Sequence, residues 1–238
     1  MMAALQTELT SRDMSAYGTA TLAMLQQILD RGVDHVALIM RHSAREFDPD
    51  RHDLENPLTD EGRTLAREWG RTLPKELILR GYTSPAERCV ETAELILEGH
   101  RSGGGEVSRS RAVEGLGVFY VLDQMKMYRA MQMSSGNSAF LDRWFAGELD
   151  KDILIPSDLA ARLVAHVVTE KLNHPLSSPQ LDLLVSHDMT LYVLRDRLLG
   201  QSSEAFGNVE FLDALAFYRE GGEIMMQSQH GDAKALSP

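Results

Sequence analysis

Two histidines occupy equivalent places in the sequence, each just after a short apolar segment. His42 follows the run 35–40 and one arginine, and His187 follows the run 181–185 and one serine. Short apolar runs of this kind are typical of strands buried on both faces of a parallel sheet. Ligands of open α/β sheets bind at the carboxyl ends of the strands. We therefore expect both imidazoles to face one crevice if the two strands are neighbours.

Three arginines accompany these histidines. Arg41 and Arg45 flank His42, and Arg88 stands in the first turn of a predicted helix that follows a Thr-Ser-Pro turn. Arginine binds phosphoryl oxygens bidentately and stays charged, so three of them suit the three non-bridging oxygens of a transferring phosphoryl group. Neighbouring cations also disfavour an imidazolium, which keeps a histidine neutral and nucleophilic. The pattern predicts phosphoryl transfer to His42, with His187 as a hydrogen-bond donor and without a metal ion.

The elements that must position these residues alternate along the chain. Apolar runs predict strands, and amphipathic segments between them predict helices. The predicted strands are 35–40, 76–82 and 181–185, with a closing hairpin of 214–218 and 224–227; the predicted helices are 22–29, 63–73 with its start at 59–62, 86–97, 157–172 and 190–199. This alternation predicts a three-layer α/β/α sandwich with a mainly parallel central sheet.

Two units are predicted along the chain. Residues 1–33 form an N-terminal helical arm, and 34–238 form the main domain, with a helical insertion over the active site at about 118–150. The glycine-rich stretch 101–105 is expected to be a flexible surface loop. The stretch 51–53, Arg-His-Asp, has no strand before it, so we interpret it as a solvated loop.

Composition narrows the class of protein. The 238 residues carry a formal net charge of −11, and 43% of them are hydrophobic. An acidic chain has no overall attraction to nucleic acid or anionic membranes, so the positive charge for an anionic substrate must be gathered locally. The single cysteine, Cys89, excludes an internal disulfide framework and a zinc site of several thiolates. With no membrane-length apolar run and no signal peptide, we expect a cytoplasmic protein that binds neither nucleic acid nor membrane.

The order of these motifs resembles the histidine phosphatase superfamily, which includes phosphoglycerate mutases and acid phosphatases. The matching segments are Arg41-His42, the stretch 56–62 (Asn-Pro-Leu-Thr-Asp-Glu-Gly), Thr83-Ser84-Pro85 with Arg88, the stretch 91–94 (Glu-Thr-Ala-Glu) and Ser186-His187. The resemblance implies a phosphohistidine intermediate on His42 and a phosphate pocket made by Arg41, Arg88 and His187. We expect no cofactor.

This chain departs from the family pattern in two respects. The family has glycine after the nucleophile, whereas this chain has Ser43, whose side chain is expected to crowd or hydrogen-bond near the site. Arg45 and Asp188 resemble the acid phosphatase branch, where that aspartate protonates the leaving group. The short chain resembles the mutase-type branch, where the acid is a glutamate at about the position of Glu114. Asp188 is the favoured general acid, and Glu114 is the alternative.

The hypothesis that follows is a metal-independent phosphomonoesterase that acts on a small phosphorylated metabolite. Two alternatives stay open. The first is a phosphoglycerate-type phosphomutase. The second is a non-catalytic phosphate-binding module, in which Ser43 marks a site that has lost turnover.

Overall fold

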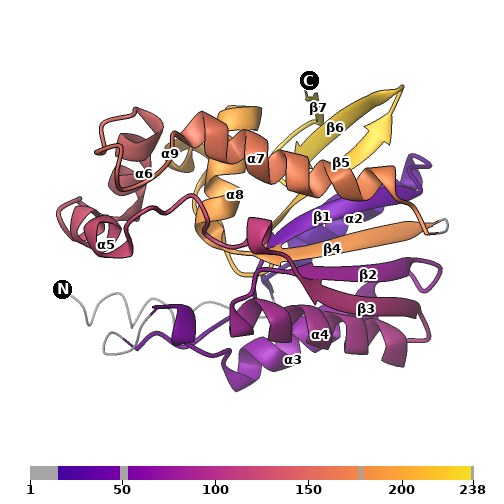
Figure 1. Ribbon diagram of the computed structural model, residues 1–238. Coiled ribbons are helices and arrows are strands. Elements are labelled where there is room, and N and C mark those ends of the chain that lie inside the picture. The colour runs from indigo at the N-terminus through magenta and orange to yellow at the C-terminus, as the bar shows by residue number, and fades with distance from the viewer. Residues whose placement is uncertain (1–15, 49–52, 177–178, 237–238) are drawn as a thin grey trace.

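Seven strands form one mixed sheet in the computed structural model, which describes residues 16–48, 53–176 and 179–236. The strands lie in the order β3-β2-β4-β1-β5-β6-β7. The first four strands of the chain run parallel, and β5 to β7 add an antiparallel edge (Figure 1). Their bounds are β1 His35–Arg41, β2 Ile78–Thr83, β3 Glu106–Ala112, β4 Gln180–Ser186, β5 Ala214–Glu220, β6 Glu223–Ser228 and β7 Lys234–Ala235.

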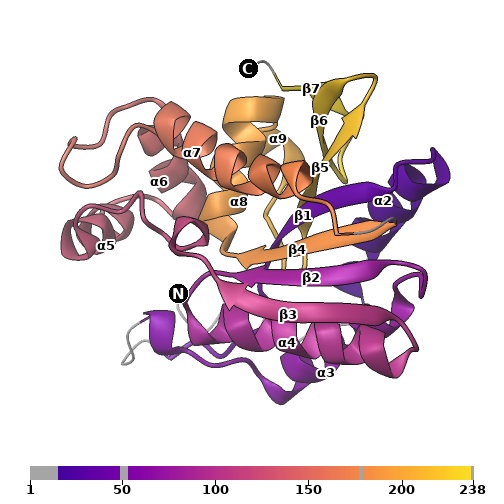
Figure 2. The ribbon, with the colours of Figure 1, turned by 45° about the vertical axis from the view of Figure 1, so that its right-hand side comes forward.

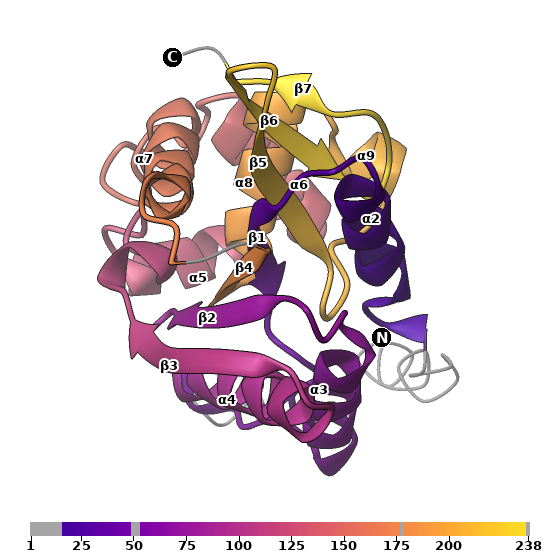
Figure 3. The same ribbon diagram turned by 90° about the vertical axis from the view of Figure 1, so that its right-hand side faces the viewer.

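Helices cover both faces of this sheet (Figure 3). One face packs against α2 (Thr19–Asp30), α3 (Asp60–Thr72) and α4 (Glu87–Ser102). The other face packs against α7 (Ser157–Thr169) and α8 (Asp188–Leu194). The predicted three-layer α/β/α sandwich with a mainly parallel sheet is therefore confirmed. No helix in the described ranges combines the length and apolarity needed to cross a bilayer.

The register of the central strands decides where the chemistry lies. β1 and β4 are parallel neighbours in which Arg41 lies opposite Ser186. β2 joins the other side of β4, with Thr83 opposite Val185. The residues that come directly after the three strands are therefore brought to one edge of the sheet.

One strand lies where the sequence did not predict any. α4 continues to Ser102, and β3 begins only a few residues later, at Glu106. The segment of β3, Glu-Val-Ser-Arg-Ser-Arg-Ala, is mostly polar and forms the edge of the sheet with only partial burial. Neither an apolar run nor a regular alternation marks such a strand. The loop predicted at 101–105 is consequently shorter than expected.

Two helices lie within the predicted insertion, α5 (Gln124–Gln132) and α6 (Asn137–Phe145). Both stand on the side toward which the parallel strands point (Figures 1 and 2).

The predicted N-terminal arm is described only from residue 16. Its helix α2 buries Leu25 and Ile28 in the core between the sheet and the helices α2, α3 and α4. The short helices are η2 Asp53–Glu55, η3 Glu114–Leu116, η4 Glu170–Asn173, η5 Arg195–Leu199 and α9 Ser203–Phe206.

Helices α3 and α4 touch backbone to backbone at two glycines. A Cβ atom at Gly70 would lie 2.1 Å from the carbonyl oxygen of Ile96, and one at Gly99 would lie 2.0 Å from the carbonyl oxygen of Arg67. Real Cβ atoms do not approach backbone oxygens so closely, so both positions require glycine. This contact fixes the position of α4, the helix that carries Arg88.

We expect Gly99→Ala to lower the free energy of unfolding by about 2–3 kcal/mol, because the added methyl group overpacks the interface between the helices. Alanine has the better helix propensity, so a loss of stability would report the close contact alone. Glu94→Ala, at an exposed position of the same helix, should change stability by less than about 0.5 kcal/mol. Urea unfolding measures both variants, and equal stability of Gly99→Ala and wild type would contradict this packing.

Candidate active site

His42 stands at the end of β1 and is 2% exposed. Its backbone N–H donates to the carbonyl oxygen of Ser186 at 3.0 Å, which ties it to the end of β4. Its Nδ1 lies 2.8 Å from the carbonyl oxygen of Ser43, an atom that only accepts, so Nδ1 carries the proton. The opposite nitrogen, Nε2, accepts a hydrogen bond from the Nε of Arg88 at 2.9 Å. The lone pair of Nε2 therefore points toward the arginine.

The surroundings of His42 keep the ring uncharged. Burial lowers its pKa well below the usual 6.5, and the positive charges of Arg88 and Arg41 lower it further. A neutral imidazole with an unprotonated nitrogen is the form that attacks phosphorus. The predicted effect of neighbouring arginines on His42 thus agrees with this geometry, and burial adds the larger share.

Arg88 connects the parts of the site. It is the second residue of α4 and is 3% exposed. Besides His42, its guanidinium contacts Nδ1 of His187 at 3.3 Å and the backbone carbonyl of Asp53 at 2.8 Å. A guanidinium has donors only, so every one of these contacts fixes its partner as an acceptor.

His187 follows β4, and its ring centroid is 5.8 Å from that of His42. Since Nδ1 accepts from Arg88, the proton lies on Nε2, which donates to the hydroxyl of Ser84 at 2.9 Å. Burial and the charge of Arg88 lower the pKa of His187 to about 4. The ring is neutral near pH 7, and its N–H is directed at Ser84. The predicted role of His187 as a donor to a phosphoryl group stays a prediction.

Arg41 ends β1 and lies beside the nucleophile. One terminal nitrogen donates to the carbonyl of Val209 at 2.7 Å, and the other forms an ion pair with Asp188 at 3.3 Å. The ring of Phe211 lies under the guanidinium, with its centroid 4.1 Å from Cζ. The same ring centroid is 6.0 Å from that of His42. Phe211 is thus a site residue that the sequence analysis missed, since a lone aromatic residue in a loop gives no signal.

Arg45 and Arg88 share one carboxylate. Oδ1 of Asp53 lies 2.6 Å from Arg45, and Oδ2 lies 3.2 Å from Arg88. The side chain of Asp53 is 58% exposed, yet both of its oxygens are engaged. The predicted exposure of Asp53 is therefore correct, but its two ion pairs with the site were not predicted, and 51 and 52 lie outside the described residues. An aspartate in a polar loop has no spacing that distinguishes it from a solvated one.

The two candidate acids differ in their surroundings. Asp188, 37% exposed, pairs with Arg41 and accepts from the Met189 backbone N–H at 2.7 Å. Burial alone would raise the pKa of Asp188, but Arg41 and this N–H outweigh it and hold the pKa below its usual value. Glu114 is exposed at the start of η3, directly after β3. In this turn, a Cβ at Gly117 would lie 3.7 Å from the hydroxyl of Ser84.

Ser43 is fully buried and turned away from the imidazole of His42. Its hydroxyl donates to the carbonyl of Gly62 in α3 at 2.8 Å, and its N–H donates to the hydroxyl of Thr92 in α4 at 3.1 Å. Of the two effects predicted for this side chain, crowding of the site is therefore wrong, and hydrogen bonding near the site is what the structure shows. The hydroxyl instead fastens the loop after β1 to the two helices below it.

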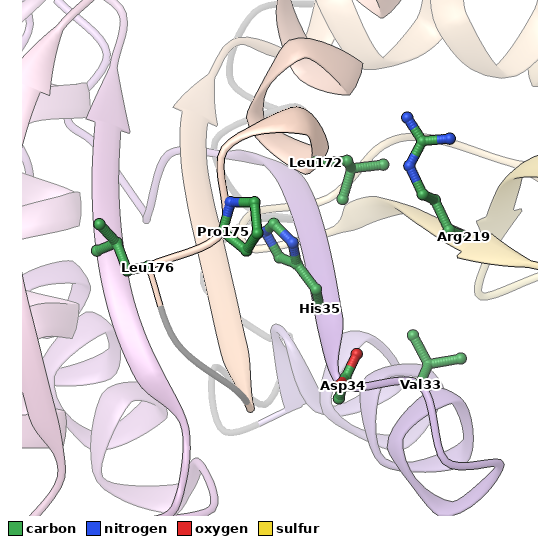
Figure 4. A pocket seen from close by; sticks show the side chains of 7 residues that line it. All are labelled: Val33, Asp34, His35, Leu172, Pro175, Leu176 and Arg219. Carbon is green, nitrogen blue, oxygen red and sulfur yellow. The ribbon is translucent and has the colours of Figure 1, made fainter.

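A cavity of about 460 Å³ lies at the other end of the sheet, where β1 begins (Figure 4). Its lining residues are Val33, Asp34, His35, Leu172, Pro175, Leu176 and Arg219. None of the predicted site residues lines it. Within the described ranges, no three His, Cys, Asp or Glu side chains are grouped so that they could hold a metal ion.

Most of the predicted site residues lie together. The connected cluster contains His42, Arg41, Arg45, Arg88, His187 and Asp188, with Ser84, Asp53 and Phe211 as further members. Glu114 borders it through its backbone turn, and within the described ranges its side chain makes no hydrogen bond to the cluster. We call this group the arginine–histidine cluster.

Known structures share the fold. A phosphoglycerate mutase from Bacillus anthracis is similar with a TM-score of 0.51 and 15% identity over 83% of this chain and 94% of that one. Bacillus stearothermophilus YhfR reaches a TM-score of 0.55 and 17% identity over 82% and 96%. Mycobacterial hydrolase 1 reaches 0.56 and 14% over 81% and 95%. At these identities the likeness concerns the fold alone.

The family assignment rests on the sequence as a whole. No curated protein sequence matches the chain. A family model described as the histidine phosphatase superfamily (branch 1), however, matches residues 37–219, well over half of the 238 residues. This stretch contains every member of the arginine–histidine cluster. The chain belongs to the histidine phosphatase superfamily, branch 1.

Proposed function

We propose that the protein is a metal-independent phosphomonoesterase that forms a phosphohistidine on His42 and acts on a small phosphorylated metabolite. One observation carries the proposal: a buried, neutral imidazole directs the lone pair of Nε2 at an arginine N–H. A phosphoryl group bound by Arg88 would therefore lie next to Nε2 of His42. Family membership supports the same reaction class.

The reaction has two steps. In the first, Nε2 of His42 bonds to phosphorus, the bond from phosphorus to the ester oxygen breaks, and a proton donor protonates the leaving oxygen. In the second, water adds to phosphorus, the N–P bond breaks, and the water proton returns to the donor. Inorganic phosphate leaves, and His42 is neutral again. No metal ion is required, because the arginines supply the positive charge.

Substrate binding requires an exchange of anions. The N–H donors of Arg45 and Arg88 that suit phosphoryl oxygens contact the carboxylate of Asp53. A phosphoryl dianion presents more charge and more oxygens to the same donors. We propose that the substrate displaces this carboxylate, whose exposed position lets it move into solvent.

Glu114 is a better candidate for the proton donor than Asp188. The carboxylate of Asp188 is already engaged by Arg41 and by the Met189 N–H, and both contacts hold its pKa below its usual value, which makes its protonated form rarer near pH 7. Its ion pair suits the positioning of Arg41 instead. Glu114 is exposed beside the turn that approaches Ser84. This reverses the preference drawn from the sequence.

The buried hydroxyl of Ser43 weakens the case for a module without turnover, since this side chain does not obstruct the nucleophile. Phosphate released from an artificial monoester without any phosphorylated primer would exclude both the module and a primer-dependent mutase. Chelators should leave that release unchanged.

His42→Ala should abolish the covalent intermediate, because it removes the nitrogen that bonds to phosphorus in the proposed first step. Wild type mixed briefly with a labelled monoester and quenched in alkali should carry an acid-labile label. The exposed His174→Ala serves as the control and should label like wild type. Equal labelling of His42→Ala and wild type, with an unchanged circular dichroism spectrum, would exclude His42 as the nucleophile.

Asp53→Asn should bind inorganic phosphate about two- to fivefold more tightly, because the neutral amide competes less well for the arginines and an ion pair of an exposed carboxylate contributes up to about 1 kcal/mol. Titration calorimetry at low ionic strength measures the change. Asp60→Asn removes the same charge from an exposed pair with Arg63 and should have no effect. Weaker phosphate binding by Asp53→Asn would mean that Asp53 organises the arginines rather than competing with the ligand.

Glu114→Gln should slow the hydrolysis of alkyl phosphates about a hundredfold and that of p-nitrophenyl phosphate less than tenfold, since only the alkoxide needs a proton to leave. Asp188→Asn should slow both substrates by similar factors, through Arg41. Steady-state kcat/KM values for the two substrates test this. The opposite pattern, selective for Asp188→Asn, would assign the proton donor to Asp188.

A further inference from the structure

The turn before β5 contains an unusual backbone conformation. Among the residues that the structure describes, Leu212 is the only non-glycine residue with a positive φ, 61°. A branched residue rarely adopts this conformation, and such strain concentrates at functional sites. Leu212 is fully buried, and its carbonyl accepts the hydroxyl of Thr21 at 2.9 Å. The surrounding structure therefore holds the conformation in place.

The turn is also closed on itself. The N–H of Asp213 donates to the carbonyl of Glu210 at 3.2 Å, and the N–H of Glu210 donates to the carboxylate of Asp213 at 2.7 Å. These two reciprocal bonds hold the segment 209–213 in a tight loop. Phe211 and Leu212 are adjacent within it, yet Leu212 enters the core below the sheet while Phe211 lies on the arginine–histidine cluster.

Three parts of this loop hold Arg41. The backbone N–H of Arg41 donates to the carbonyl of Asp213 at 2.9 Å, and its guanidinium donates to the carbonyl of Val209 at 2.7 Å. The ring of Phe211 covers the guanidinium, 4.1 Å from Cζ. The Nε of Arg41 is buried without a hydrogen-bond partner. A guanidinium that has lost hydration in this way gains more from an aromatic face than an exposed one does.

The ring of Phe211 also lies near His42 and packs against Tyr17. Its centroid lies 6.0 Å from the ring of His42, and Tyr17 meets it edge-on, 5.5 Å away at 84°. Phe211 is only partly buried, so its volume is not needed to fill a closed core. Besides Tyr17, its ring contacts the two residues that carry the proposed chemistry, Arg41 and His42.

We propose that the Val209–Asp213 loop is a positioning element, in which Phe211 sets the guanidinium of Arg41 and the imidazole of His42 in the arrangement that receives a phosphoryl group. The inference rests on the proposed function and extends it to a residue that is not itself reactive. The backbone conformation of Leu212 directs the Phe211 ring toward the site. The carbonyls of Val209 and Asp213 hold Arg41. Without the ring, Arg41 keeps its hydrogen bonds but can tilt away from phosphorus.

Vanadate, a phosphate analogue, tests this without any need for turnover. Phe211→Leu keeps an apolar side chain of similar size and removes the ring face. We expect the Kd for vanadate to rise about tenfold and kcat/KM for p-nitrophenyl phosphate to fall by a similar factor, the size of a desolvated cation–π contact. Phe211→Tyr restores the ring and should return both values to within about threefold of wild type.

Phe206→Leu is the matched control. Phe206 is also partly buried and lies against an imidazole, that of His230, at 5.8 Å, but outside the arginine–histidine cluster. The Phe206→Leu substitution should lower neither the affinity for vanadate nor kcat/KM. A Phe211→Leu protein with a lower Tm but wild-type vanadate Kd and kcat/KM would overturn the inference, as would an equal loss in Phe206→Leu. A wild type that neither binds vanadate nor releases phosphate would instead overturn the proposed function, and this inference with it.

Discussion

The in-register parallel pairing of β1, β4 and β2 is the constraint on which the site depends. Because Arg41 lies opposite Ser186 and Thr83 opposite Val185, the three strands end together. Moving one strand by two residues would keep its buried face but would shift its end by roughly 6–7 Å, farther than a hydrogen bond spans. The buried apolar strands thus determine whether His42 and His187 can share one arginine.

Burial and local charge then determine the protonation states of His42 and His187. The chain as a whole is acidic, with a net charge of −11, yet three arginines converge at the carboxyl edge of the sheet. Burial and this local charge lower the pKa of both histidines. The acceptor nitrogens are fixed by where Arg88 donates, so one side chain determines the proton positions on two rings. Its own place follows from the glycine contact between α3 and α4.

Features that leave a periodic pattern in the sequence could be predicted, whereas features that depend on a single tertiary contact could not. The buried strands, the alternation of strands and helices, and the residues after them were predictable, because burial and spacing leave a periodic trace. The edge strand β3 was not, because its polar side chains face solvent. Asp53 and Phe211 escaped notice because each acts through contacts made by an irregular loop. The direction of the Ser43 side chain likewise depends on a single carbonyl, that of Gly62 in α3, for which the sequence gives no signal.

The carboxylate of Asp53 has a consequence for product release in the proposed reaction. Inorganic phosphate, the product of the proposed reaction, needs the same N–H donors as the substrate, and the carboxylate already contacts them. An internal anion of this kind weakens the hold on substrate and product alike, which raises the substrate concentration needed for saturation but leaves the barrier of the chemical step unchanged. In the proposed reaction, the tethered anion would compete with released phosphate for the arginines just as it competes with substrate, so product would leave more readily than from arginines without a partner.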